Sequence, residues 1–515
     1  MGGRLLTDAV NIEAIRRPGP RTELSARRGA LAHRVLPRIA MTLRFGLGLA
    51  ISTALATLGM LLPLAACSSD DRAAAAPEPV VPDAAPAPDA LPPAEVDAAP
   101  PKVIPKPTFP EVQSRGGPVI KDPKVVAIVF ANDPFATKIT DFTSKVAASA
   151  YWKGVGLEYG VGPITAMPTI TIAVDELAPA AITSGQIETW LKAKLAGPTP
   201  AFGTPDASTL YAIYYPAGTT ITMDGAGEQG QSCAGYGGYH FEIDASGTQV
   251  GYAVLPRCLD IDELTIAASH EYFEWATDPF PKTKPAYNKL DDDHWAWQAA
   301  FIGELGDLCT FLDRENLKPA DIGFEVQRQW SNKLSLAGKY PCAPTKSTPY
   351  LQAIPTAEDL AIVPSSSQFG KSTKTKAIRV PPGGERTIDV LVYSDQAAGQ
   401  SVPMRVMSYQ QFYGGKGGAK SGFTFTLEES YGKTGSTVPV TISAPKEAAS
   451  DIMMMLAYTS QSTVNYWPVL VVNDSDANAA AGNPSVLPVF TPPGVARKRL
   501  PFTTLGMGSA RPRLP

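Results

Sequence analysis

Apolar and polar positions along residues 111–345 follow patterns typical of both strands and helices. Short apolar or alternating runs predict strands at 124–130, 169–174, 210–215 and 252–255. Helical spacing of the apolar positions predicts helices at 136–151, 182–195 and 262–276. Because strands alternate with helices, this region is expected to form an α/β or α+β domain.

The period of the pattern changes after residue 345. Short alternating runs predict strands at 387–393, 402–409, 422–427, 438–443 and 452–459. Turn signals such as Pro381-Pro382-Gly383-Gly384 separate them. Several short strands joined by polar turns predict an all-β sandwich domain over residues 346–475. The fold class expected for the chain is therefore α+β, followed by a β-sandwich.

The N-terminal region holds an apolar run that does not belong to a folded core. Arg44 precedes residues 45–62, and the run leads into Leu64-Ala65-Ala66-Cys67. This resembles a bacterial lipoprotein signal, which predicts a mature chain beginning at a lipidated Cys67. The alternative is a transmembrane helix, for which about 18 residues interrupted by glycines are short. Residues 1–66 are thus a leader, within which Met41 is an alternative start.

Two segments have the composition of unstructured chain. Residues 67–110 are rich in Ala, Pro and Asp, which predicts an extended linker, and residues 476–515 predict a disordered tail. Residues 1–66 hold nine Arg and three acidic side chains, so the remainder has 36 basic and 46 acidic ones. An acidic exported protein without a basic patch is a poor nucleic-acid binder.

Four cysteines follow Cys67, at positions 233, 258, 309 and 342. An even number in an exported chain predicts disulfides rather than free thiols. Their spacing favours Cys233–Cys258 and Cys309–Cys342, although three pairings exist. No C-x-x-C motif is present, so zinc binding by cysteine is not expected.

The segment Ser269-His270-Glu271-Tyr272-Phe273-Glu274 carries the most specific chemistry of the chain. It has the form H-E-x-x-E, a carboxylate variant of the H-E-x-x-H zinc signature. Positions i and i+4 share one face of a helix, so His270 and Glu274 are expected to hold one metal ion together. Glu271 then occupies the position of the general base in a zinc hydrolase.

A third ligand has to come from another segment. Asp278 lies two turns beyond His270, about 12 Å along a helix, and therefore does not reach the same ion. Glu304 and Asp307 in Gly303-Glu304-Leu305-Gly306-Asp307-Leu308-Cys309 are the best candidates, with Asp307 alternatively orienting His270. Two carboxylates and one imidazole would make bound Zn²⁺ a weaker Lewis acid than three imidazoles would.

Other interpretations of these residues stay open. His240 ends the glycine-rich segment 233–240 and is a candidate for polarising a substrate carbonyl or for binding metal, or it is a loop histidine without a role. A helix with His and Glu on one face is more often solvated or ion-paired than metal-bound. The acidic segment around Glu304 and Asp307 shifts the balance towards a metal site.

The motifs in their order along residues 116–342 resemble the phosphate-induced protein (EXORDIUM-like) superfamily and its bacterial relatives that carry H-E-x-x-E. The resemblance comprises Gly116-Gly117-Pro118-Val119, residues 211–216, 233–240, 269–279 and 303–309, Gln329-Trp330-Ser331-Asn332 and Cys342. It implies an extracellular domain with a zincin-like helix. It implies neither a substrate nor an activity.

These patterns lead to one principal hypothesis and two alternatives. The principal one is a lipid-anchored protein of the cell envelope, with the outer membrane or surface favoured, that carries a zinc-dependent peptidase-like site and acts on protein or glycan. The first alternative is a non-catalytic surface module that binds glycan or protein and uses the H-E-x-x-E helix structurally. The second is a metal that only stabilises the fold.

Overall fold

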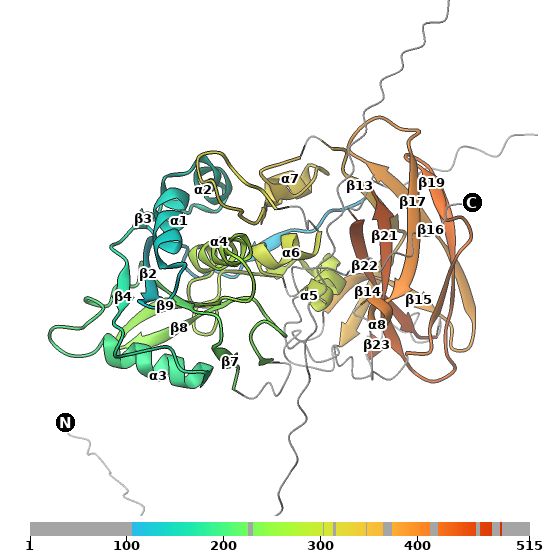
Figure 1. The fold of residues 1–515 in the computed structure, drawn as a ribbon. Helices are drawn as coiled ribbons and strands as arrows, with labels where there is room; N and C mark the ends of the chain where they lie inside the picture. Colours follow the sequence, from blue (N-terminus) through green and yellow to red (C-terminus); the bar gives the residue numbers. More distant parts are fainter. Residues whose placement is uncertain are drawn as a thin grey trace, which may run out of the picture. The chain divides into compact units, whose positions relative to one another are not determined.

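The computed structural model describes residues 106–224, 230–301, 303–312, 316–346, 348–363, 373–412, 421–459, 464–475 and 485–486 (Figure 1). The chain divides into two units, Met1–Asp97 and Ala98–Pro515, and all described residues belong to the second. The predicted leader, Cys67 and most of the predicted linker and tail lie outside the described residues. Of the helices that are described, none combines the length and apolarity needed to cross a membrane.

A six-stranded mixed sheet forms the centre of the first folded region. Its main path is β3-β2-β6-β9-β8, and β4 also pairs with β2. Neighbouring strands are parallel except that β8 runs antiparallel to β9 at one edge. The strands span β2 Lys124–Phe130, β3 Thr165–Ala166, β4 Ile170–Ile172, β6 Thr209–Tyr215, β8 Tyr239–Ala245 and β9 Thr248–Pro256.

Helices cover both faces of this sheet, and β2, β6 and β9 therefore bury nearly every side chain. Val125, Ala127 and Val129 of β2 face the core beneath α1 and α4, whereas Val126 and Ile128 share the opposite core with α3. The helices are α1 Ala136–Ala148, α2 Ala150–Gly156, the 3₁₀ turn η1 Leu157–Tyr159, α3 Ser184–Lys194 and α4 Ile261–Thr277. The mixed α+β class predicted from the sequence is confirmed.

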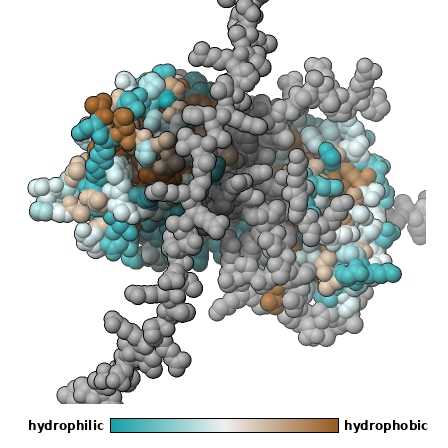
Figure 2. Space-filling model, turned by 60° about the horizontal axis from the view of Figure 1, so that its bottom comes forward, coloured by the Kyte–Doolittle hydropathy of each residue, from teal (hydrophilic) through white to brown (hydrophobic). Residues whose placement is uncertain are grey.

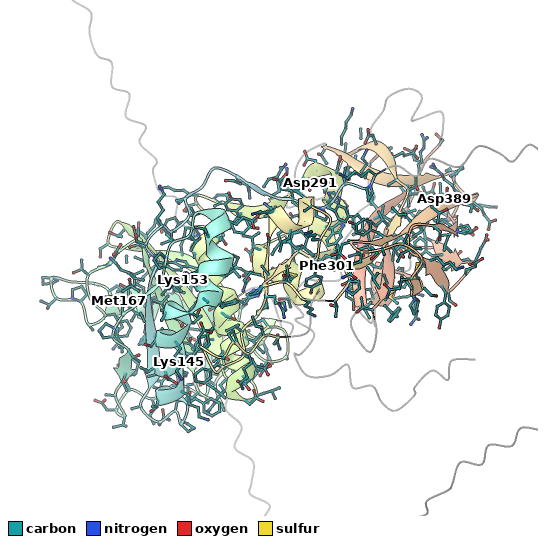
Figure 3. All side chains as sticks on the ribbon, turned by 90° about the horizontal axis from the view of Figure 1, so that it is seen from above. Lys145, Lys153, Met167, Asp291, Phe301 and Asp389 are labelled. Atoms are coloured by element: carbon teal, nitrogen blue, oxygen red, sulfur yellow. A yellow bond between two sulfur atoms is a disulfide. The ribbon has the colours of Figure 1, made fainter. Side chains whose placement is uncertain are left out.

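Short elements complete this region. Small two-stranded sheets pair β1 Val112–Ser114 with β10 Tyr287–Leu290, β5 Ala181–Thr183 with β7 Thr220–Thr222, and β11 Gln329–Trp330 with β12 Cys342–Ala343. The remaining helical elements are η3 Asp292–His294, α5 Trp295–Phe301, α6 Leu305–Leu312 and α7 Asn332–Leu336. Asp291 and Phe301, labelled in Figure 3, mark the start of η3 and the end of α5.

Residues 351–473 form two packed sheets with the arrangement of a β-sandwich. One sheet has the order β13-β16-β20-β18, with bounds Leu351–Pro355, Glu385–Ser394, Thr437–Ser443 and Thr424–Leu427. The other has the order β19-β17-β21-β22-β15-β14-β23, with bounds Tyr431–Lys433, Ser401–Ser408, Ser450–Tyr458, Val464–Asn473, Thr373–Val380, Glu358–Val363 and Ser485–Val486. The short helix α8 Tyr409–Phe412 follows β17.

Burial patterns explain which strands the sequence revealed. β20 alternates buried and half-buried residues because one face packs on the other sheet, which gives the period of two. β21 and β22 are buried on both faces, since β13 covers one side while α8 and α5 contact the other. Two residues of the predicted tail, Ser485 and Val486, pair with β14. Phe109, at the end of the predicted linker, is buried against Tyr393.

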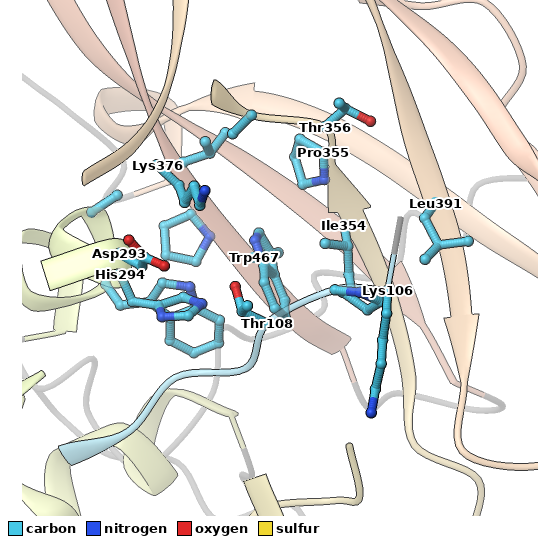
Figure 4. Close-up of a pocket in the computed structure, with 16 residues that line it drawn as sticks. Lys106, Thr108, Asp293, His294, Ile354, Pro355, Thr356, Lys376, Leu391 and Trp467 are labelled. Carbon is cyan, nitrogen blue, oxygen red and sulfur yellow. The ribbon is translucent and has the colours of Figure 1, made fainter. Parts of the chain in front are cut away.

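A small cavity of about 210 Å³ lies among residues of η3, α5 and the sandwich strands (Figure 4). His294, Lys376 and Trp467 line it together with apolar side chains. Elsewhere on the surface, Figure 2 shows both hydrophilic and apolar side chains among the described residues of one face. Exposed large apolar side chains include Leu157, Val174 and Leu177. Isolated exposed apolar residues of this kind are ordinary on a protein surface.

Candidate metal centre

Helix α4 carries the H-E-x-x-E motif through the middle of the fold. Asp260 caps its first turn by accepting a hydrogen bond from the Glu263 backbone N–H at 3.0 Å. From Leu264 to Thr277 every residue is buried, because the helix packs on β9 and β8 and against α1 and α6. The motif thus lies inside the domain, where polar side chains need partners.

Asp278 ends this helix, as the sequence predicted, and it stays away from the motif's ligand atoms. Its carboxylate accepts hydrogen bonds from the Ala286 N–H at 2.6 Å and from Asn288 Nδ2 at 2.7 Å. Burial raises the pKa of Asp278 to about 6, although these hydrogen bonds oppose the rise. Asp278 therefore fixes the loop after α4.

Side chains of α4 and α6 converge around the imidazole of His270. His270 Nε2 lies 2.9 Å from Glu274 Oε2 and 3.6 Å from Asp307 Oδ1, and Glu271 Oε1 is 3.9 Å away. The other Glu274 oxygen, Oε1, accepts a hydrogen bond from the Asp307 backbone N–H at 2.9 Å. Two atoms bound to one zinc ion lie about 3.3–3.5 Å apart, because each bond is about 2.1 Å long. The spacing of these atoms is that of a ligand set.

Hydrogen bonding at the far side of His270 determines its tautomer. Gln327 Oε1 lies 3.0 Å from His270 Nδ1, while Gln327 Nε2 donates to the Gly306 carbonyl at 2.7 Å. Since a carbonyl only accepts, the amide oxygen is the atom that faces the imidazole, and Nδ1 carries a proton. In the neutral imidazole the second nitrogen, Nε2, then presents a lone pair to the Glu274 carboxylate. A nitrogen lone pair and a carboxylate oxygen 2.9 Å apart repel each other unless a proton or a metal ion lies between them.

Two residues of the site could not be found from the sequence: Gln327, and Thr310, whose Oγ1 donates to Gln327 Oε1 at 2.8 Å. Neither residue belongs to a motif, and Gln327 is 57 positions from His270. The Ser269 hydroxyl, next to the motif, fixes this segment by accepting a hydrogen bond from the Gln327 N–H at 2.9 Å. A downstream amide with no helical or strand pattern around it gives no signal in a sequence.

His240 enters the same cluster from the edge strand β8. Its Nδ1 lies 3.3 Å from Glu271 Oε2 and 3.6 Å from Glu274 Oε2, and the ring is buried. Burial disfavours the imidazolium, but the hydrogen bond with Glu271 and the charge of Glu304 outweigh it and raise the pKa of His240 to about 9. The loop interpretation of His240 is wrong, because this residue is part of a strand and of the buried cluster.

Two groups of ligand atoms result among the described residues. One consists of His270, Glu274 and Asp307, and the other of His240, Glu271 and Glu274. In each group the atoms lie within 4.8 Å of one another. Glu304 belongs to neither group, although it is buried, precedes α6 directly and acts on His240 through its charge. The cluster can therefore bind a divalent metal ion, and His and carboxylate ligands are those that Zn²⁺ accepts.

Two glycines make this close packing possible. A Cβ on Gly306 would lie 2.8 Å from Glu274 Oε1 and 2.9 Å from His270 Nδ1. A Cβ on Gly238 would lie 2.9 Å from Glu271 Oε1. Both contacts are shorter than van der Waals distance, so any larger residue at either position would displace a carboxylate of the cluster.

Both predicted disulfides are confirmed, and each lies next to a segment of the site. Cys309–Cys342 joins α6, two residues after Asp307, to β12. Cys233–Cys258 joins the segment before β8 to the loop that leads into α4. The two bonds restrain the elements that carry His240, Asp307 and the motif helix.

The cluster is closed to solvent. His240 and His270 are each 1% exposed, Glu271 is 0% exposed, and Asp307, the most accessible member, is 7% exposed. The cavity of Figure 4 contains no member of either ligand group. A substrate larger than water would reach the cluster only after some of the surrounding side chains have moved.

No family model matches the chain, and no curated protein matches it. Among solved structures, domains 4 and 5 of the S-layer protein SbsC are similar with 16% identity, a TM-score of 0.16 and coverage of 25% of this chain and 55% of that one. A family 123 glycoside hydrolase from Clostridium perfringens has 8% identity, a TM-score of 0.14 and coverage of 24% and 27%.

A nucleoside hydrolase-related hypothetical protein from Saccharophagus degradans is similar over 68% of this chain and 100% of its own, with 8% identity and a TM-score of 0.21. The match to the SbsC fragment covers about half of the length of that fragment. TM-scores at this level do not establish a shared fold.

Proposed function

We propose that this chain is a metal-dependent hydrolase with a peptidase-like site. His270, Glu274 and Asp307 hold one divalent ion, preferably Zn²⁺, and Glu304 is an additional candidate ligand beside them. The observation that carries the proposal is the position of His270 Nε2, which lies 2.9 Å from one buried carboxylate and 3.6 Å from another. Such an arrangement is stable when a cation lies between the three groups.

Glu271 is the proposed general base. It follows His270 directly on α4, its Oε1 faces the His270 side of the cluster, and its Oε2 faces His240. When bound, Zn²⁺ would act as a Lewis acid and lower the pKa of a water molecule. Glu271 would accept the proton of that water and pass it to the leaving group.

His240 is proposed to act on the substrate side. It approaches from β8, and the neighbouring carboxylates Glu271 and Glu304 raise its pKa, which favours the protonated imidazole. A protonated imidazole stabilises negative charge that develops on a carbonyl oxygen. In this assignment the hydrogen bond to Glu271 positions both groups.

The cellular setting is part of the proposal. The signal-like segment before Cys67 supports a lipid anchor in the cell envelope, and the two disulfides are typical of an exported protein. The resemblance to bacterial EXORDIUM-like proteins supports a zincin-like assignment of α4. The β-sandwich serves as an accessory region for binding the protein or glycan substrate.

One observation favours a second candidate function. All members of both ligand groups are at least nine-tenths buried, which is typical of a metal that stabilises a fold. In that case the chain is a surface module that binds glycan or protein, and α4 is structural. The burial of the ligand groups distinguishes this candidate from an open enzyme site.

Two measurements separate these functions. Elemental analysis of the purified full chain is expected to show one zinc ion per chain at low free zinc, and its loss with Glu274→Gln. Glu271→Gln is expected to keep the zinc and to reduce cleavage of a casein-derived peptide mixture by about 10²-fold or more. Equal cleavage by wild type and Glu271→Gln leaves only the structural function. A chain without zinc refutes the hydrolase and the fold-stabilising metal, and leaves only a surface module in which α4 is structural.

A further inference from the structure

The two ligand groups share one residue, Glu274. We infer that His240, Glu271 and Glu274 bind a second divalent cation, and that this cation inhibits the enzyme by occupying Glu271. The inference rests on the proposed function of the first group, which uses His270 and Asp307.

Glu274 Oε2 occupies the position of a bridging atom. It lies 2.9 Å from His270 Nε2 in the first group and 3.6 Å from His240 Nδ1 in the second. His240 Nδ1 is also 3.3 Å from Glu271 Oε2. Pairs of metal ions in proteins are about 3.5–4 Å apart and are commonly held by a shared oxygen ligand. Glu274 lies between the imidazoles of His270 and His240. Each imidazole also lies near a second carboxylate, Asp307 for His270 and Glu271 for His240, which is the arrangement of such a pair.

The cluster gathers several carboxyl groups in the interior, because Glu271, Glu274, Glu304 and Asp307 are all buried. Ionised carboxylates in such a place are costly unless they are paired. A divalent ion held by His240, Glu271 and Glu274 would provide this pairing in the second group.

Occupation of the second group has a direct consequence for catalysis. Glu271 Oε2 would coordinate the cation instead of accepting a proton, and His240 Nδ1 would no longer be protonated. Gly238 keeps the space at Glu271 Oε1 free of a side chain, so Glu271 retains room on that side. The same residues then serve as base and substrate contact at low metal concentration and as an inhibitory site at high concentration.

The experiment is a zinc titration of the full chain by equilibrium dialysis, with elemental analysis at micromolar free zinc. Wild type is expected to bind in two steps, to two zinc ions per chain, and His240→Ala to stop at one. Glu242→Gln is the matched control, because Glu242 is also buried on β8, belongs to neither group and keeps its acceptor oxygen for Lys282 and Thr283. This variant is expected to bind two. Near-UV circular dichroism checks that each variant is folded.

Cleavage of the casein-derived peptides is expected to fall about 10²-fold as the second step fills, because the base is lost. A single step to one zinc in wild type overturns the inference and leaves the proposed function intact, as does a second zinc retained by His240→Ala. If His240→Ala does not fold, the number of steps in wild type alone decides the outcome. A wild-type chain that binds no zinc refutes the proposed function as well.

Discussion

Gln327 Oε1 lies 3.0 Å from His270 Nδ1 and, together with Thr310 Oγ1 at 3.4 Å, holds this nitrogen away from the carboxylates of the cluster. Replacing Gln327 with Met keeps the volume and removes the acceptor. The imidazole is then free to rotate or change tautomer, so the dissociation constant for zinc is expected to rise about 10- to 100-fold. Competition with a fluorescent chelator measures this change.

Gln329 offers a matched control for this substitution. It is equally buried in the same segment and donates to the Ser269 carbonyl of α4, but it does not contact His270. Gln329→Met is expected to lower the thermal stability to a similar extent without changing the zinc affinity. An equal loss of zinc affinity in both variants would show that Gln327 acts only through packing.

Gly306→Ala tests the space between α6 and α4. The added methyl would lie 2.8 Å from Glu274 Oε1 and force that oxygen away from the Asp307 N–H. Zinc affinity is expected to fall at least tenfold, about 1.4 kcal/mol, which is the cost of one lost hydrogen bond to a charged group. Isothermal titration calorimetry measures the change.

Gly154→Ala is the control for the intrinsic effect of replacing a helical glycine. Gly154 lies in α2, and a Cβ there meets nothing within 4 Å. Alanine is expected to leave zinc binding unchanged and to raise the free energy of unfolding by up to about 1 kcal/mol, because alanine favours helix. Unchanged zinc affinity in Gly306→Ala would contradict the close approach of α6 to Glu274.

Asp291 links stability to pH at a position away from the metal centre. Burial by itself would raise the pKa of Asp291, but the hydrogen bond and charge of His294 and the Glu111 N–H lower it below its usual range. A lowered pKa in the folded state stabilises the fold above the unfolded pKa of about 3.9, and this contribution disappears as the pH falls below it. Asp291→Asn is therefore expected to cost about 1–3 kcal/mol at pH 7.

Urea unfolding of wild type and Asp291→Asn at pH 7 and at pH 3 measures this linkage. The difference between the two proteins should shrink at pH 3, where Asp291 of the unfolded wild-type chain is largely protonated and folding therefore has to release that proton. Asp292→Asn is the control, since Asp292 forms an exposed ion pair with Lys289 in the same turn, and a change below about 1 kcal/mol is expected. A difference for Asp291→Asn that is independent of pH would rule out the charge as its cause.

Removal of the Cys309–Cys342 disulfide is expected to affect the metal centre as well as the fold. A double replacement by Ser should lower the free energy of unfolding by about 2–5 kcal/mol. Because Cys309 follows Asp307 by two residues on α6, zinc affinity at the His270 group should fall too. Replacing Cys233 and Cys258 with Ser should lower the free energy of unfolding by a comparable amount, but it should weaken zinc binding at the His240 group rather than at the His270 group. Zinc titration and thermal unfolding of both double variants test this difference.

Much of the secondary structure could be predicted because burial in each element follows its own period. β2 spans Lys124–Phe130 as the apolar run indicated, and α4 spans Ile261–Thr277, one residue beyond the predicted helix at each end. The predicted helix at 136–151 is two helices, since Ser149 adopts an extended conformation and caps α2 through the Trp152 N–H. A capping serine inside an apolar repeat does not interrupt that repeat.

Other elements escaped prediction for a physical reason. β22, Val464–Asn473, is buried on both faces and contains Pro468, a residue that argues against a central strand, so its run gave no clear strand pattern. β8 is an edge strand whose pattern mixes His240, Glu242 and Asp244 with aromatic residues. The functional side chains of β8 replace the apolar residues that would have revealed the strand.

The local chemistry of the site was already present in the order of residues along the chain. An H-E-x-x-E spacing places His270 and Glu274 on one helix face whatever surrounds that helix, and the spacing of the cysteines favoured the pairs that form. The tertiary structure decided everything that depends on residues far apart. In the folded chain Asp307, and not Glu304, belongs to the His270 group. His240 lies beside Glu271, and Gln327 contacts His270. Helical geometry is fixed by neighbouring residues, whereas the approach of α6, β8 and residue 327 to α4 is fixed by how the whole core packs.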